Sequence, residues 1–251
     1  MFDDTFMSAV FDCQIEETEC LLKIVLERDD LKVETTKTQY TISNEYGHEV
    51  RLDIRATDSQ NRAYNVEVQR QKHGADVRRA RFNAAMLDRT LLGEGQDYDQ
   101  LPDRYTIFIT EKDYFGKGLP AYHAENRIKE LDNEPLGDGG YIVYINGQYR
   151  NTDSPIGRLM HDFFCSNPEE MLTPILRDRV RYLKETERGQ LEVCELMERI
   201  VAEEVEKANE VQAKTIAEKM YKKKMPVEEI ADFVGYSVEV VEKWLGLTSA
   251  I

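Results

Sequence analysis

Two short runs in the first third of the chain, residues 51–55 and 63–69, alternate polar and apolar residues with the two-residue period of a half-buried β-strand. Residues 58–62 between them are rich in turn formers, so the two runs predict a β-hairpin. If the hairpin is symmetric about Gln60, Asp53 lies opposite Glu67, Arg51 opposite Gln69 and Arg55 opposite Asn65. These six polar side chains then share one face, and the core face consists of Leu52, Ile54, Ala56, Tyr64, Val66 and Val68.

The remaining pattern predicts a mixed α/β domain. Residues 3–27 have the period of an amphipathic helix, residues 31–43 alternate as a strand does, and residues 74–92 predict a second helix. Apolar runs at 105–110 and 141–147 predict buried strands. Elements in this order indicate a central mixed sheet flanked by helices.

After about residue 165 the chain changes to a helical tail. Residues 168–224 are almost free of glycine, and residues 227–245 have the pattern of two short helices around Gly235, as in a helix-turn-helix. The second short helix carries few of the side chains that read base edges, so we expect a packing or oligomerisation hairpin. The sequence therefore predicts an α/β domain over residues 1–165 and a helical tail over residues 166–251.

An apolar stripe at helical spacing in the tail predicts a packing seam, with a homo-oligomer formed through these helices as one interpretation. The stripe consists of Val193, Met197, Ile200, Val205, Ala208, Val211 and Ile216.

The composition changes the picture through its charge, which is −15 at pH 7. A surface this acidic argues against general coating of nucleic acid, which needs basic residues. No apolar run is long enough to span a bilayer, and the start lacks the pattern of a signal peptide, so we expect a cytoplasmic protein with no membrane partner. The four scattered cysteines form no CxxC pair and are expected to be reduced thiols.

Two carboxylates directly opposite each other in a hairpin repel, which makes the Asp53 and Glu67 pair unusual. A hard divalent cation between them is one explanation. The alternative is a solvated strand face on which Arg51 and Arg55 neutralise the acids.

The most basic stretch of the chain follows the hairpin directly, with six basic residues against two acidic ones in residues 70–92. A helix that buries Val77, Ala80 and Ala84 would leave arginines toward the polar face of the hairpin. The alternative is ordinary surface charge at i, i+4 spacing.

In these motifs and in the order of its elements, the chain resembles the PD-(D/E)XK nuclease superfamily. More narrowly, it is similar to the recombination-promoting nuclease (Rpn-like) family of transposase-related proteins. The matching stretches are Asp4-Thr5-Phe6, Arg51-Leu52-Asp53-Ile54 and Tyr64-Asn65-Val66-Glu67-Val68-Gln69, followed by the arginine-rich helix, the strand at 105–110 and the helical tail. The resemblance covers most of the chain.

The resemblance implies a restriction-endonuclease-like α/β core and Mg²⁺- or Mn²⁺-dependent hydrolysis of DNA, linked to recombination or mobile elements. Asp53 and Glu67 would ligate the metal, with the Val68 carbonyl as a further oxygen ligand. Gln69 stands where most of the superfamily has a lysine, and it would position the attacking water by hydrogen bonds without supplying charge.

The resemblance also implies contacts outside the hairpin. Arg78 or Arg81 would contact the DNA phosphate, and an N-terminal acid would assist the metal. Asp4, Glu16, Glu17 and Glu19 remain alternatives for that acid. Against the endonuclease stands a second function, a non-catalytic, oligomeric interaction module that keeps the nuclease fold, which the acidic charge and the missing lysine favour.

Overall fold

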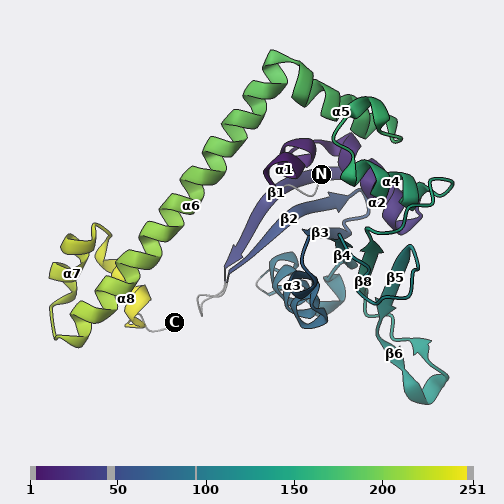
Figure 1. Ribbon diagram of the computed structural model, residues 1–251. Helices are drawn as coiled ribbons and strands as arrows, with labels where there is room; N and C mark the ends of the chain where they lie inside the picture. Colours follow the sequence, from purple (N-terminus) through teal and green to yellow (C-terminus); the bar gives the residue numbers. More distant parts are fainter. Residues whose placement is uncertain (1–3, 44–48, 94, 248–251) are drawn as a thin grey trace. The chain divides into compact units, whose positions relative to one another are not determined.

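A computed structural model describes residues 4–43, 49–93 and 95–247. Six strands form one mixed sheet in the order β1-β2-β3-β4-β8-β5, and β6 and β7 form a separate two-stranded sheet (Figure 1). The strands are β1 (Val33–Ser43), β2 (Glu49–Asp58), β3 (Ala63–Gln69), β4 (Arg104–Thr110), β5 (Ala121–Glu125), β6 (Arg127–Ile128), β7 (Glu134–Pro135) and β8 (Gly140–Asn146).

The helices are α1 (Asp4–Phe11), α2 (Ile15–Leu26), α3 (Val77–Leu91), α4 (Pro155–Phe164), α5 (Pro174–Glu185), α6 (Glu187–Lys222), α7 (Val227–Val234) and α8 (Val238–Leu245). A short 3-10 helix, η1 (Lys72–Ala75), precedes α3. The predicted sheet flanked by helices is therefore confirmed. The helix predicted over residues 3–27 is instead two helices, because Cys13 between them has a left-handed φ of 57°.

Strands β3, β4 and β8 are parallel neighbours and form the centre of the sheet. Glu67 pairs with Phe108 of β4, and Phe108 pairs in turn with Tyr144 of β8. The last five residues of β4 are all buried, as expected for a parallel strand covered on both faces.

The β2–β3 hairpin has the predicted register, with Arg55 opposite Asn65 and Thr57 opposite Ala63. Its loop is held by the buried carboxylate of Asp58, whose Oδ1 accepts hydrogen bonds from the backbone N–H groups of Gln60 and Arg62. Its Oδ2 accepts from Arg62 Nε and from the Tyr64 hydroxyl, each at 2.7 Å. These bonds offset the cost of burial and hold the pKa of Asp58 below its usual value.

Part-way along β1 and β2, the side chains that face α3 switch from one set of alternate residues to the other. Thr38 bonds to Asp12 after α1, whereas Tyr40, two residues later, packs with Leu52, Met86 and Leu87 against α3. Gln39 between them has a left-handed φ of 53°, which interrupts the alternation. Leu52 therefore lies on the α3 face with Ala63, and the prediction that it shares a face with Tyr64 and Val66 is wrong.

The chain divides into two compact units, residues 1–193 and 194–251. The predicted boundary between the α/β domain and the tail, after residue 165, stays a prediction. In the structure α4 and α5 both pack against α2 and belong to the first unit.

In the second unit, α7 and α8 enclose an apolar cluster with the end of α6. Gly235 ends α7 with a φ of 77°, and Ser237 caps α8. The Trp244 ring packs 4.7 Å from that of Tyr236. None of the helices in the described ranges is both long and apolar enough to cross a membrane.

Candidate active site

The two predicted metal ligands lie where β2 and β3 stop pairing. The ladder between these strands runs from Thr57 and Ala63 to Ile54 and Val66. One residue further, Asp53 Oδ2 accepts a hydrogen bond of 2.8 Å from the Val68 N–H. The Glu67 carboxylate accepts a bond from the Asp53 backbone in return. Each acid thus takes a backbone donor of the opposite strand, which fixes both carboxylates between the strands.

Glu67 is an ionisable group with no exposed surface. Burial, and to a lesser extent the nearby charge of Asp53, raise the pKa of Glu67, which lies at about 8. Hydrogen bonds from Asn65 and from the Asp53 backbone, and the charge of Arg79, act in the opposite direction. A carboxyl group in this setting favours its protonated form at neutral pH unless a cation is added.

Helix α3 places a cation beside Glu67. The Arg79 Nη2 atom lies 3.6 Å from Glu67 Oε2, an ion pair longer than a hydrogen bond, and the Arg79 side chain is 45% exposed. Asp76 caps the helix by accepting from the Arg78 N–H at 2.8 Å. Arg79 occurs one turn before the buried Asn83, so the helix face that contacts the sheet also carries this arginine.

Arg78 and Arg81 are exposed on other faces of α3. Arg81 lines a cavity of about 360 Å³ with Asp88, Arg104 and Glu125, over the β4–β8–β5 side of the sheet. The structure therefore brings Arg79 to the carboxylates, and the phosphate contacts of Arg78 and Arg81 stay a prediction. The expected burial of Val77 is wrong, since this side chain is 48% exposed, because α3 turns its polar Asn83 toward the sheet.

Glu67 Oε2 and the Oδ1 atom of the neighbouring Asn65 are buried and have no hydrogen-bond partner among the described residues, and the same holds for Nδ2 of the buried Asn83 in α3. Buried polar atoms without partners are rare in folded proteins. Asn65 donates its Nδ2 to Glu67 Oε1 at 3.1 Å. Neither asparagine was singled out from the sequence, although Asn65 shares a face with Glu67 two residues later.

The donor set fits a hard cation. Two carboxylates, one with an oxygen that has no hydrogen-bond partner, provide the ligand type that Mg²⁺ prefers, and waters ordinarily complete its octahedron. Residues 4–43, 49–93 and 95–247 contain no cluster of three or more His, Cys, Asp or Glu side chains suited to a metal. The site therefore rests on this pair, with the Val68 carbonyl as the predicted further ligand.

Gln69 ends β3, and its backbone carbonyl accepts from the Glu111 N–H at 2.9 Å. Its side chain lies against Gly74 of η1, where an added Cβ would come within 2.0 Å of Gln69 Oε1. Because glycine has no side chain, position 74 leaves room for the Gln69 amide.

The candidate N-terminal acids do not form a group with the pair in what the structure describes. Glu19 accepts hydrogen bonds from Lys23 Nζ at 2.7 Å and from the N–H of Val33, the first residue of β1, at 3.0 Å. Glu17 is half-buried with a pKa raised by burial, and Arg179 acts against this shift. Glu16 is exposed, and the Asp4 side chain lies outside the described residues.

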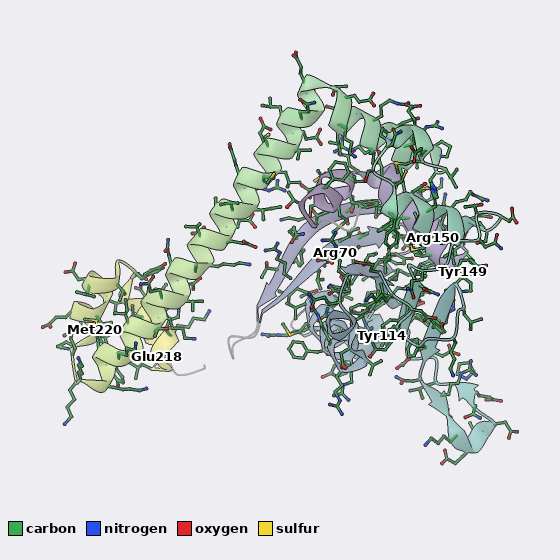
Figure 2. All side chains as sticks on the ribbon, viewed as in Figure 1. Arg70, Tyr114, Tyr149, Arg150, Glu218 and Met220 are labelled. Atoms are coloured by element: carbon green, nitrogen blue, oxygen red, sulfur yellow. The ribbon has the colours of Figure 1, made fainter. Side chains whose placement is uncertain are left out.

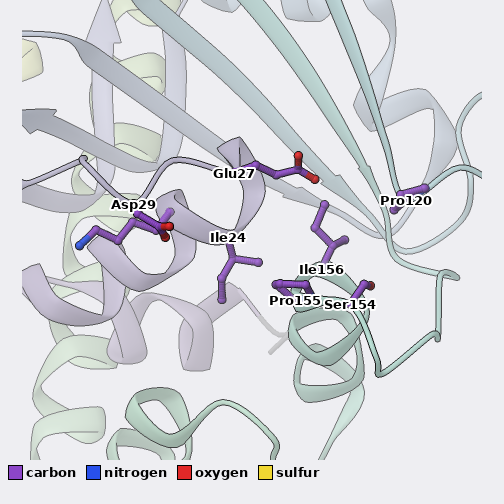
Figure 3. A pocket seen from close by; sticks show the side chains of 8 residues that line it. Ile24, Glu27, Asp29, Pro120, Ser154, Pro155 and Ile156 are labelled. Atoms are coloured by element: carbon purple, nitrogen blue, oxygen red, sulfur yellow. The ribbon is translucent and has the colours of Figure 1, made fainter.

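A cavity of about 440 Å³ lies elsewhere in the first unit (Figure 3). It is bounded by the end of α2, by Pro120 and by the start of α4, and it contains none of the predicted site residues.

The sequence matches the model of one protein family, described as PD-(D/E)XK nuclease family transposase, over residues 18–154. The chain belongs to this family. The matched range contains the sheet, the Asp53 and Glu67 pair and helix α3. Comparisons with curated proteins and with solved structures gave no significant match.

The buried glutamate predicts an unusual dependence of stability on pH in metal-free buffer. Because the folded state keeps the Glu67 proton up to about pH 8 and the unfolded chain releases it near 4.5, the free energy of unfolding should fall as pH rises through this window. Glu67→Gln keeps the shape without the titration, so the variant should be more stable than the parent at pH 9 and closer to it at pH 5.

Urea unfolding in EDTA at pH 5, 7 and 9 measures this difference, with the exposed Glu130→Gln as the matched control. An identical pH profile for parent and Glu67→Gln would show that Glu67 is ionised in the folded protein.

Proposed function

We propose that this chain is a Mg²⁺-dependent DNA endonuclease that acts in the cytoplasm on recombining or mobile DNA. The observation that carries the proposal is the pair itself, in which the half-buried Asp53 and the fully buried Glu67 each accept a hydrogen bond from the backbone of the opposite strand. Holding two carboxylates this close opposes folding unless the pair serves a cation. Membership of the nuclease family supports the same chemistry.

In this proposal Asp53, Glu67 and the Val68 carbonyl hold the ion, and Asn65 orients Glu67 through its Nδ2 bond. A bound Mg²⁺ or Mn²⁺ would polarise the scissile phosphate and lower the pKa of a water molecule. Gln69 would orient that water through its amide, in the space left by Gly74.

The arginines of α3 would neutralise the phosphates that the acidic surface otherwise repels. Arg79 is nearest to the carboxylates, and Arg78 and Arg81 would take phosphates further along the strand.

Plasmid nicking tests the activity. The parent should convert supercoiled plasmid to the nicked form with Mg²⁺ or Mn²⁺ and not with EDTA. Asp53→Ala should slow nicking on the order of 100-fold or more, since the loss of a ligand removes several kcal/mol of transition-state stabilisation. The exposed Asp97→Ala is the matched control and should nick as the parent does.

Nicking that is equal in the parent and in Asp53→Ala would reject the site. No nicking by the parent under any divalent metal would favour the non-catalytic, oligomeric module, for which the charge of −15 and the neutral Gln69 speak.

The phosphate contacts have their own test. Arg78→Ala with Arg81→Ala should weaken DNA binding and reduce the slope of log K against log salt by roughly two units, since each phosphate contact contributes about one. The free energy of unfolding should change little, because both side chains are exposed. Arg177→Ala in α5 is the control. Unchanged DNA affinity in the double variant would leave α3 as a helix with ordinary surface charge.

We also infer that the chain self-associates through its C-terminal helices. Met197, Val205 and Val211 of α6 are each about half exposed or more, which is unusual for a long helix of a monomer. Sedimentation velocity should show an oligomer for the parent and a smaller species when these three residues are replaced by Glu. A parent that sediments as a monomer at micromolar concentration would contradict this inference.

A further inference from the structure

The connection from β4 to β5, residues 111–120, is held by one carboxylate and one phenol. Asp113 accepts hydrogen bonds from the N–H groups of Gly118 at 2.7 Å and Phe115 at 3.2 Å, and from the Tyr122 hydroxyl at 2.8 Å. The Tyr122 oxygen accepts in turn from the N–H groups of Lys117 and Leu119. The loop therefore has a fixed shape without regular secondary structure.

This fixed loop holds an aromatic ring at the surface. The Phe115 ring contacts Tyr114 and Tyr144 in T-shaped geometry, with centroids 4.9 and 5.2 Å apart, yet 43% of the residue is exposed. Tyr114 stacks on Tyr144 at 5.0 Å and packs beside the start of α3 (Figure 2).

The ring cluster adjoins the candidate active site. Glu67 pairs with Phe108, Phe108 pairs with Tyr144, and the Phe108 and Tyr144 rings stack at 5.3 Å. Two strand spacings place Tyr144 roughly 10 Å from Glu67, about three base steps of 3.4 Å. The Glu111 N–H bond to the Gln69 carbonyl also joins the start of the loop to the end of β3.

Basic residues flank Phe115 in the sequence, where Lys112 and Lys117 are both exposed. Arg70, at the end of β3, is also exposed, and its Nε lies 3.8 Å from the Glu111 carboxylate at the start of the loop (Figure 2). The Asp113 carboxylate is directed inward to its hydrogen-bond donors. Exposed aromatic rings between basic side chains are the chemistry that binds single-stranded nucleic acid, by base stacking and phosphate contact.

We propose that the loop of residues 112–119 is a stacking platform for unpaired bases, so that the DNA strand entering the site is single-stranded or locally opened. A base inside a duplex has both faces covered by its neighbours, and only an unpaired base offers a face to Phe115. This proposal rests on the proposed function, because it takes DNA as the substrate of the Asp53 and Glu67 site.

Fluorescence anisotropy with the full chain in EDTA tests the platform without cleavage. The probes are a labelled 20-nucleotide single strand and the corresponding duplex. Phe115→Leu, which keeps an apolar side chain in the loop, should weaken single-strand binding about tenfold, since one base–aromatic stack is lost, and change duplex binding less than twofold. Phe115→Tyr should bind as the parent does. Leu131→Ala, a similarly exposed apolar position near the β6–β7 sheet, is the matched control.

A second probe reports the stack itself. A single strand containing 2-aminopurine should lose fluorescence on binding to the parent and to Phe115→Tyr, and lose less on binding to Phe115→Leu. Binding by the parent that is unaffected by Phe115→Leu, or weakened equally for both probes, would overturn the platform and leave the nuclease proposal intact. No binding of either DNA by the parent would overturn both.

Discussion

The first unit is organised around the contact between two acids at the point where β2 separates from β3. Asp53 accepts the Val68 N–H, and Glu67 accepts from the Asp53 backbone. These bonds replace the strand pairing that ends at Ile54 and Val66, so the carboxylates carry part of the structure as well as the proposed chemistry. Burial of Glu67 makes its negative charge costly, and the arrangement calls for a cation.

The neighbouring elements place specific side chains around this pair. Helix α3 directs Arg79 toward Glu67 and places Asn83 in the buried interface, and η1 provides Gly74 beside Gln69. Because the side chains of β1 and β2 switch faces near Gln39, Leu52 packs on α3, and Asp53 lies at the position where the switch occurs. Because Gln69 is neutral, the positive charge that the structure places beside Glu67 is that of Arg79 in α3.

The sequence was sufficient where the period of apolar residues is clean. The two strands on either side of residues 58–62, the strand at 105–110 and the register about Gln60 are confirmed, because turn residues and alternation determine them locally. The prediction that arginines of this helix lie toward the hairpin is confirmed for Arg79. The sequence did not indicate which arginine it would be, because the helix was oriented by its apolar residues, whereas the structure buries the polar Asn83 and exposes Val77.

Other features depend on single backbone angles or on long-range packing. The break at Cys13 and the face change at Gln39 come from left-handed residues that no periodicity reveals. In the sequence the β4–β5 connection is marked only by the turn formers Gly116, Gly118 and Pro120. Its shape depends on the hydrogen bond that the Tyr122 hydroxyl donates to Asp113, nine residues earlier. Such contacts are set by the assembled sheet and not by the local sequence.

The central claim is that Asp53 and Glu67 together form one divalent metal site. Titration calorimetry with Mn²⁺ tests it directly, on the parent and on Asp53→Asn, Glu67→Gln and the control Asp97→Asn. We expect one Mn²⁺ site per chain in the parent and in Asp97→Asn, and an affinity at least about tenfold weaker in each of the two site variants, because each variant removes a charged oxygen ligand. Equal Mn²⁺ affinity in all four proteins would contradict it.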